Sequence, residues 1–349
     1  MTLSSAIVIA AFAAQAAAPA AAPRSKTADT PPRASDASAP TVDLETLRTQ
    51  VMLDRAGFSP GPIDAKAGGN TRKALARYQE QNQTPPEALE PLTAYTITPE
   101  DAAGPFVPSV PADLVQQAAL PSLAYTSQLE ALAERFHATP ALLQQLNPSS
   151  QFAAGEQIQV PNVEPLIAPV EKPEPSPEAL AAEKNARGAR PAGTTGRRGP
   201  AAPRQPNTLS MRPDVTVTVS KTASALSVAD ASGRTIFYAP VTTGSEHDPL
   251  PIGEWKVNGI QFNPSFNYNP ELFWDADPAH SKARIPSGPN NPVGLVWIDL
   301  SKEHYGIHGT PEPAAIGRTQ SHGCVRLTNW DALKLAGMVK PGTRVIFAE

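Results

Sequence analysis

The chain has 349 residues, a formal net charge of −4, 40 prolines and a single cysteine. Its length allows two or three domains, and the mild negative charge argues against nucleic-acid binding, which usually needs a basic face. One cysteine excludes an intramolecular disulfide framework, and the clustering of the prolines indicates compact modules joined by extended linkers.

An apolar run at residues 5–14 has the length of the hydrophobic region of an export signal, and Ala14-Gln15-Ala16 offers a small-x-small cleavage site. No Lys or Arg precedes this run, so an alanine-rich tail is the alternative. We expect a signal peptide over residues 1–22, too short for a transmembrane helix. A disordered linker rich in Ala, Pro, Ser and Thr should follow over residues 23–40. We therefore expect no stable membrane span after signal cleavage.

Residues 41–84 have a helical pattern. Apolar residues recur at helical spacing in two stretches, Leu44, Leu47, Val51 and Met52, then Ala74, Leu75 and Tyr78. The unit resembles the small peptidoglycan-binding domain found beside many wall enzymes, on Leu53, Ala56-Gly57-Phe58, Pro62-Ile63-Asp64, Asn70-Thr71, Ala74-Leu75 and Tyr78-Gln79. A generic helical hairpin is the alternative interpretation.

Residues 122–163 form a second pattern, with two helical faces followed by a turn and a short strand over residues 155–162. This segment resembles a LysM module, a sugar-chain binder with strand-helix-helix-strand order, on Leu146-Asn147-Pro148 and the run 155–162. The Gly-Asp-Thr entry usual in that family is replaced by Ser127-Gln128-Leu129, so we expect the fold with weakened or lost sugar binding. The proline-rich stretch 164–213 is expected to be a semi-extended linker.

Residues 214–349 are expected to form a mainly β domain, like a sandwich or barrel, and the whole chain a multidomain protein. Val215, Val217 and Val219 alternate with polar residues, as in a half-buried strand. Further strand-like runs cover residues 235–238, 254–257, 293–298 and 344–347. One helix is predicted from about residue 329 to 338, with Thr328 or Asn329 as its cap.

The single cysteine, Cys324, has two histidines that could activate it, because a thiol attacks carbonyls only as the thiolate. His322 would share a face with Cys324 in an extended segment, and His308 could meet the thiol across the fold. Gly309 and Gly323 allow close backbone approach, and nearby N–H groups could form an oxyanion hole.

Arg326 suits a substrate carboxylate or a developing oxyanion, although a plain salt bridge is its alternative role. Two other interpretations of Cys324 stay open. One is a buried structural thiol, and the other is a zinc site formed with His322, His308 and His304.

The run 321–329, with His308-Gly309 upstream, resembles the signature of the L,D-transpeptidase (YkuD) catalytic domain, and the resemblance covers residues 214–349. It implies an acyl-enzyme on peptidoglycan stem peptides. Cys324 would attack the third residue of a tetrapeptide stem, the terminal D-amino acid would leave, and a second stem would accept the acyl group in a 3→3 cross-link. Water or a lipoprotein lysine is the alternative acceptor, and a non-catalytic peptidoglycan-binding protein is the alternative class.

The resemblance also implies the role of each residue. Cys324 would be the nucleophile, and His308 the base, oriented through its other nitrogen by a backbone carbonyl. His322 would be the third catalytic residue, lining the site and tuning the thiolate or binding substrate. The expected substrate-binding residues are Arg326, Gly323, Ser321, Gly309, Asn329, Tyr268 and Trp274.

Tyr268 and Trp274 lie in a long segment, residues 262–292, that should cover the active site, because loops of this length are usually functional. Packing within this lid is their alternative role. We expect no metal or other cofactor. The expected partners are peptidoglycan stem peptides and glycan strands, in the periplasm or cell wall.

Overall fold

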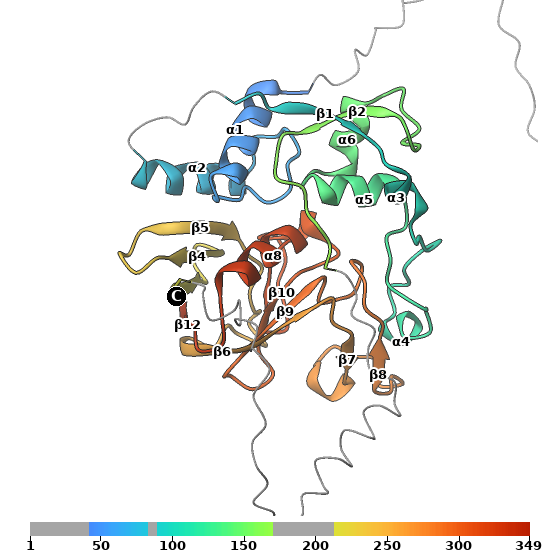
Figure 1. Cartoon of the computed structure of the whole chain (residues 1–349). Coiled ribbons are helices and arrows are strands. Elements are labelled where there is room, and N and C mark those ends of the chain that lie inside the picture. Colours follow the sequence, from blue (N-terminus) through green and yellow to red (C-terminus); the bar gives the residue numbers. More distant parts are fainter. Residues whose placement is uncertain (1–41, 83–88, 170–212) are drawn as a thin grey trace, which may run out of the picture. The chain divides into compact units, whose positions relative to one another are not determined.

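The computed structural model describes residues 42–82, 89–169 and 213–349 (Figure 1). The expected signal peptide, the N-terminal linker and most of the proline-rich linker lie outside these ranges. Within the described ranges, no helix combines the length and apolar character needed to cross a membrane.

Two helices, α1 (Leu44–Arg55) and α2 (Gly69–Gln81), occupy the first expected module. The side chain of Asp43 caps α1 by accepting the N–H groups of Glu45 and Thr46, which satisfies two backbone donors at the helix start. Gln50 of α1 is buried, and its amide nitrogen donates to Asp64 (2.9 Å) in the turn that follows the helix.

A strand-helix-helix-strand unit follows, but it begins earlier than residue 122. Strand β1 (Leu92–Thr96) pairs antiparallel with β2 (Gln157–Pro161), and α5 (Gln128–Arg135) and α6 (Pro140–Leu146) lie between them in the sequence. Two short helices, α3 (Pro99–Ala103) and α4 (Leu114–Gln117), lie in the long β1–α5 connection.

The two N-terminal modules expected from the sequence share one hydrophobic core. Leu47 and Val51 of α1 are buried together with Leu132 of α5, Leu142 of α6 and Ile158 of β2. This shared core packs α1, α5, α6 and β2 together. The described residues 42–82 and 89–169 are hereafter called the N-terminal part.

The C-terminal domain is built on one eight-stranded sheet in the order β11-β10-β9-β6-β12-β3-β4-β5. The strands are β3 (Thr216–Ser220), β4 (Ala225–Ala229), β5 (Thr235–Pro240), β6 (Gly253–Phe262), β9 (Val296–Leu300), β10 (Gly306–His308), β11 (Val325–Arg326) and β12 (Arg344–Ala348). The mainly β character expected from the sequence is confirmed.

The sheet curls until its two edges meet. Thr242, two residues after β5, exchanges backbone hydrogen bonds with Arg326 of β11, at 3.1 and 2.9 Å. This closure gives the domain the barrel-like character that was expected, and it places β11 between β10 and the segment that follows β5.

Helix α8 (Asn329–Met338) begins three residues after β11 and lies between the sheet and the N-terminal part (Figure 1). The hydroxyl of Thr328 caps it by accepting the Asp331 N–H. Trp330 and Leu335 of α8 are buried against sheet residues that include Val217, Ile298 and Phe347.

The segment 262–292 contains more structure than a plain loop. A small hairpin pairs β7 (Phe266–Tyr268) with β8 (Ala283–Ile285), and the 3-10 turn η2 (Pro270–Leu272) lies between them. A second 3-10 turn, η3 (Pro313–Ala315), follows β10.

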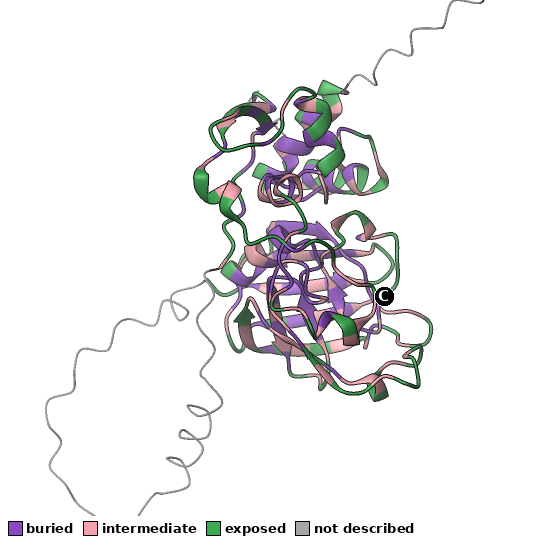
Figure 2. Ribbon diagram, turned by 90° about the vertical axis from the view of Figure 1, so that its right-hand side faces the viewer, coloured by how far each residue is buried: buried purple, intermediate pink, exposed green. Residues whose placement is uncertain are grey.

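The N-terminal part and the C-terminal domain are packed against each other through buried polar groups. Lys334 of α8 donates to Asp54 (2.8 Å), and the other oxygen of Asp54 pairs with His137 Nδ1 (2.9 Å). The His137 ring stacks on Trp330 with centroids 5.1 Å apart, and Ser59 donates to Asp331 (2.7 Å). Figure 2 shows buried residues in the helices of one part and the sheet of the other.

Candidate active site

Cys324 lies one residue before β11, where the sheet closes. The parallel pairing of β10 and β11 sets Ile307 opposite Val325 and His308 opposite Arg326. Successive strand side chains point to opposite faces, and Ile307 and Val325 are both buried in the core. His308 and Arg326 therefore share the other face, and the same alternation brings Cys324 to that face.

His308 is buried, and its tautomer follows from one hydrogen bond. Its Nδ1 lies 2.7 Å from the carbonyl oxygen of Gly309, and a carbonyl oxygen only accepts, so Nδ1 carries the proton. In the neutral ring, Nε2 then has a free lone pair. The Trp297 ring stacks on His308 with centroids 5.4 Å apart, which fixes the plane of the imidazole.

The electrostatic environment keeps both reacting groups neutral at rest. Burial lowers the pKa of His308 to about 3, and the positive charge of Arg326 adds to this effect. Burial also raises the pKa of the Cys324 thiol, although the Gly306 N–H and Arg326 oppose the rise. A neutral thiol and a neutral imidazole are therefore the resting forms, and the thiol lies 3.8 Å from the His304 carbonyl oxygen.

His322 does not have the extended relation to Cys324 that the sequence suggested. Gly323, between them, has a φ of +100°, so the segment is not a strand there. His322 Nε2 instead pairs with Asp275 Oδ1 (2.7 Å) in the segment 262–292, and its ring contacts Phe273 with centroids 5.0 Å apart. His322 thus connects the cysteine loop to this lid segment.

The cysteine loop is held by Ser321 and shaped around Gly323. The Ser321 hydroxyl donates to the Cys324 carbonyl (2.6 Å), which places Ser321 beneath the loop as a support. A Cβ at Gly323 would come within 2.7 Å of the Tyr305 ring. Tyr305 is therefore a wall of the site.

Several polar atoms of the site are unpaired. The Nε atom of Arg326 is buried without a hydrogen-bond partner, and the backbone N–H groups of Gly323 and Cys324 reach no acceptor among the described residues. Burial lowers the pKa of Arg326, and the charges of Cys324 and Glu312 oppose this shift. These donors could bind an anionic or carbonyl oxygen.

Asn329 is not exposed to a substrate. It is fully buried, and its Oδ1 accepts the Leu295 N–H (3.0 Å) while its Nδ2 donates to Glu134 (2.6 Å). Gly309 packs against this amide, because a Cβ on Gly309 would lie 2.1 Å from Asn329 Oδ1. Both residues support the backbone behind His308, in place of the substrate contacts expected for them.

The two aromatic residues of the lid segment have different positions. Tyr268 is buried and its hydroxyl lies 3.0 Å from His280 Nδ1, which corresponds to the alternative of lid packing. Trp274 is 60% exposed and stacks on His247 with centroids 4.4 Å apart. Its ring centroid also lies 6.1 Å from that of His322, so Trp274 remains available at the rim of the site.

Within the described ranges, no group of three or more His, Cys, Asp or Glu side chains is arranged to hold a metal ion. The zinc site considered for Cys324, His322, His308 and His304 thus has no matching ligand cluster.

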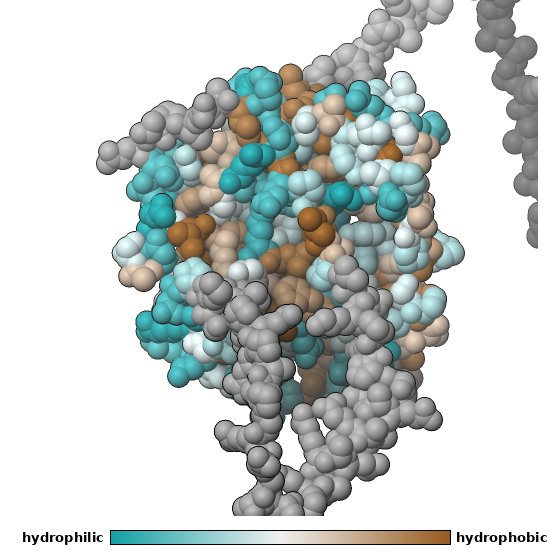
Figure 3. Space-filling model, viewed as in Figure 1, coloured by the Kyte–Doolittle hydropathy of each residue, from teal (hydrophilic) through white to brown (hydrophobic). Residues whose placement is uncertain are grey.

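Figure 3 shows exposed apolar side chains in separate areas among hydrophilic ones on the face drawn there.

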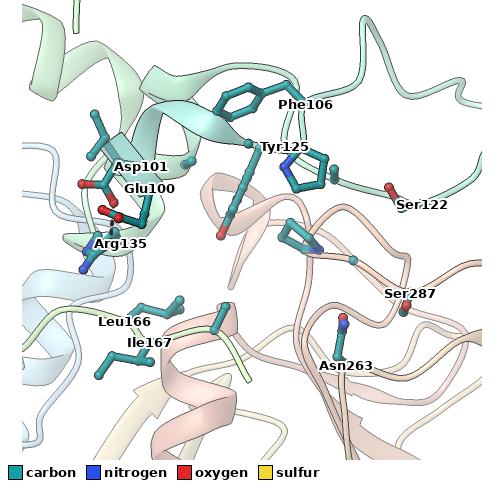
Figure 4. A pocket seen from close by; sticks show the side chains of 18 residues that line it. Glu100, Asp101, Phe106, Ser122, Tyr125, Arg135, Leu166, Ile167, Asn263 and Ser287 are labelled. Atoms are coloured by element: carbon teal, nitrogen blue, oxygen red, sulfur yellow. Dashed lines mark hydrogen bonds and ion pairs between the residues drawn. The ribbon is translucent and has the colours of Figure 1, made fainter. Parts of the chain in front are cut away.

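A cavity of about 360 Å³ lies elsewhere, between the N-terminal part and the two ends of the lid segment. Tyr125 and Arg135 line it from the N-terminal part, and Asn263 and Ser287 line it from the lid ends (Figure 4). Cys324 and His308 do not line this cavity.

Comparison with known proteins identifies the C-terminal domain. Residues 214–347 match the family model of the YkuD L,D-transpeptidase catalytic domain. Three relatives carry L,D-transpeptidase names: YkuD of Bacillus subtilis is 54% identical over 57 residues, YbiS of Escherichia coli K12 is 35% identical over 120 residues, and YqjB of Bacillus subtilis is 31% identical over 115 residues.

These matches cover 16%, 33% and 31% of this chain and 35%, 38% and 57% of the respective relatives, so the chain spans less than two thirds of each. Among solved structures, an L,D-transpeptidase from Mycobacterium smegmatis is 18% identical, with a TM-score of 0.32 and coverage of 39% of this chain and 59% of that chain. A likeness this low adds no argument. By the family match, residues 214–347 of this chain are a YkuD L,D-transpeptidase catalytic domain.

Proposed function

We propose that the chain is an exported cysteine L,D-transpeptidase that acts on peptidoglycan stem peptides through an acyl-enzyme at Cys324. The observation that carries this proposal is the arrangement on one sheet face of Cys324, the free Nε2 of His308 and the charge of Arg326. The match of residues 214–347 to the catalytic domain of this family supports the reaction class.

The first half-reaction transfers the acyl group to the enzyme. As Cys324 Sγ bonds to the carbonyl carbon of the third stem residue, the thiol proton passes to His308 Nε2. The tetrahedral intermediate then collapses, the bond to the terminal D-amino acid breaks, and the departing amine takes the proton from the imidazolium. The products are a thioester at Cys324 and a free D-amino acid.

The second half-reaction restores the enzyme. The side-chain amine of a second stem attacks the thioester carbon and gives a proton to His308 Nε2. The C–S bond breaks, the sulfur recovers a proton from the imidazolium, and a 3→3 amide cross-link leaves. His308 acts as a base and then as an acid in each half-reaction, which requires the neutral ring with a free Nε2.

Because Cys324 and His308 are both neutral at rest, the thiol proton passes to His308 as the sulfur attacks the carbonyl carbon. Burial opposes the charged form of both Cys324 and His308, so a separated thiolate–imidazolium pair is not the stable form before substrate binds. In the parallel sheet, the Cα atoms of these residues are diagonal neighbours, roughly 8 Å apart by strand spacing and rise. Their side chains can bridge this separation once a substrate orients the thiol.

The unpaired donors supply the remaining chemistry. The N–H groups of Gly323 and Cys324, which have no acceptor among the described residues, would stabilise the oxyanion. The guanidinium of Arg326 would bind a substrate carboxylate. His322, held by Asp275, would contact the stem from the lid side together with Trp274.

The test is incubation of the purified full-length chain with tetrapeptide muropeptides, followed by product analysis by mass. We expect cross-linked dimers with loss of one D-amino acid per link, and none with Cys324→Ala. Tripeptide without dimers would identify water as the acceptor, and a stable adduct with a lysine peptide would identify protein tethering. If the folded wild type gave no acyl adduct and no product, the protein would be a non-catalytic peptidoglycan binder.

A further inference from the structure

Glu134 of α5 is an acid buried in the N-terminal part, and no cation among the described residues pairs with it. It is 7% exposed, and burial raises its pKa to about 8, so it is largely protonated at neutral pH. The titratable groups around it are Glu130, which raises its pKa further, and Tyr125. Burying such a group is costly unless it is hydrogen-bonded. Across the described ranges, Glu134 makes one short side-chain hydrogen bond.

That contact is with Asn329, the first residue of α8. Asn329 Nδ2 donates to Glu134 Oε1 (2.6 Å) and also to the Pro289 carbonyl (3.2 Å). Its Oδ1 accepts the Leu295 N–H (3.0 Å), which fixes the orientation of the amide, because a rotated amide would place a donor against a donor. The Asn329 amide can make four hydrogen bonds, two as donor and two as acceptor. Glu134 accepts one of them, and the orientation of this buried amide is fixed.

The Asn329 amide in turn lies against the peptide that orients His308. Gly309 approaches Asn329 Oδ1 so closely that a Cβ would be 2.1 Å from this atom. The carbonyl of the same glycine accepts the His308 Nδ1–H. A displacement of the amide would move the Gly309 peptide and with it the acceptor that selects the His308 tautomer.

We propose that Glu134 is a positioning residue for His308, acting through Asn329 and Gly309, so that the N-terminal part completes the active site of the catalytic domain. The proposal rests on the proposed role of His308 as base. It assigns the N-terminal part a function besides wall binding. Glu134 belongs to a module expected to be a separate sugar binder. Its side chain nevertheless contacts Asn329, which packs against the Gly309 peptide that orients His308.

Three variants of the full-length chain separate this role from general stability. Glu134→Ala removes the acceptor of Asn329 Nδ2, whereas Glu134→Gln keeps a neutral oxygen of similar reach. Leu143→Ala, in α6, removes a fully buried side chain from the core of the same N-terminal part without touching Asn329. It is the control for loss of stability alone.

Two readouts are needed. One is the single-turnover rate of Cys324 acylation, with the donor concentration varied to separate maximal rate from apparent affinity. The other is the tautomer of His308 in ¹⁵N-labelled protein, read from the ring nitrogen shifts by NMR. The tautomer does not depend on any peptidoglycan substrate, so it reports even if the proposed function fails.

We expect Glu134→Ala to lower the maximal acylation rate by about 10- to 100-fold, as misplacement of a catalytic group does, with little change in apparent affinity. His308 should then give mixed tautomers. Glu134→Gln should stay within about threefold of the wild type and keep the Nδ1–H form. Wild-type acylation and tautomer in folded Glu134→Ala would overturn the proposal, as would an equal rate loss in Leu143→Ala at matched thermal stability.

Discussion

The active site and the Asp54 cluster behind α8 both bring charged groups out of water, but they differ in how these groups are paired. At the interface, Asp54 is paired through both carboxylate oxygens, to Lys334 and to His137. At the active site, the Arg326 Nε and the N–H groups of Gly323 and Cys324 have no partner in the part of the chain that the structure describes. Paired groups stabilise a packing arrangement, whereas unpaired donors remain available to a substrate.

The pKa shifts follow the same division. The charges of His137 and Lys334 hold the pKa of Asp54 well below its ordinary value, although burial acts in the opposite direction. At the site, burial and Arg326 together lower the pKa of His308. The Asp54 cluster therefore keeps its carboxylate charged, and the site favours a neutral base that becomes charged only during reaction.

The largest expected effect is on the active-site side of this comparison. Cys324→Ala should abolish acylation, with a rate loss on the order of 10⁴-fold or more, because the nucleophile has no substitute. Its thermal unfolding should stay close to that of the wild type. Intact-protein mass after incubation with a donor peptide measures the effect, and an adduct on the variant would identify a different nucleophile.

At the interface, substitution is expected to lower the stability of the fold. Asp54→Ala should lower the free energy of unfolding by about 3–5 kcal/mol, because Lys334 and His137 lose a shared buried partner. Denaturant unfolding measures this change. Lys221→Ala, which removes an exposed ion pair with Glu349, is the matched control and should have little effect. An equally small effect of Asp54→Ala would mean that the interface is not a structural clamp.

Stability should depend on pH through the two buried acids with raised pKa values. Burial raises the pKa of Glu134 from 4.5 to about 8 and that of Asp331 from 3.8 to about 6. Between the ordinary and raised values the folded chain binds more protons than the unfolded chain. The free energy of unfolding should therefore fall as pH rises from about 4 to about 8, by up to about 1.4 kcal/mol per pH unit for each acid.

Glu134→Gln should remove the part of this slope that extends above pH 6, as measured by denaturant unfolding at several pH values. Asp54 has the opposite sign, because its lowered pKa gives stability that is present above pH 4 and lost as pH falls further. An unchanged slope between pH 6 and 8 in the glutamine variant would show that Glu134 does not titrate there.

The smallest effect is expected at the lid. Asp275→Asn weakens the exposed pair with His322, so acylation should slow by less than about 10-fold, because exposed pairs contribute little. The effect should appear in apparent donor affinity more than in maximal rate. A loss as large as that of Cys324→Ala would make the His322–Asp275 pair a part of the chemistry.

The elements that local sequence determines were predicted well. Helix α8 begins and ends where it was predicted, because Thr328 supplies the cap within the same segment. The cysteine run also carries its pattern locally, so Cys324 and Arg326 could be proposed as site residues without a structure. His308 could be proposed because the glycine beside it is part of the same short motif.

Features that depend on distant pairing could not be predicted in this way. Strand β1 was missed because Leu92–Thr96 is mostly exposed and is recognised only through its pairing with β2. The position of Asn329 depends on Glu134, which is 195 residues away in the sequence. Tyr305 likewise becomes part of the site only through its packing on Gly323.

The most direct measurement of the central claim is the pH–rate profile of Cys324 acylation for His308→Gln and His322→Gln, compared with the wild type. We expect His308→Gln to lose about 10²- to 10⁴-fold, the usual contribution of a general base. His322→Gln should keep most of the wild-type rate. Loss of all acylation in His322→Gln with retention in His308→Gln would contradict the assignment of His308 as the base.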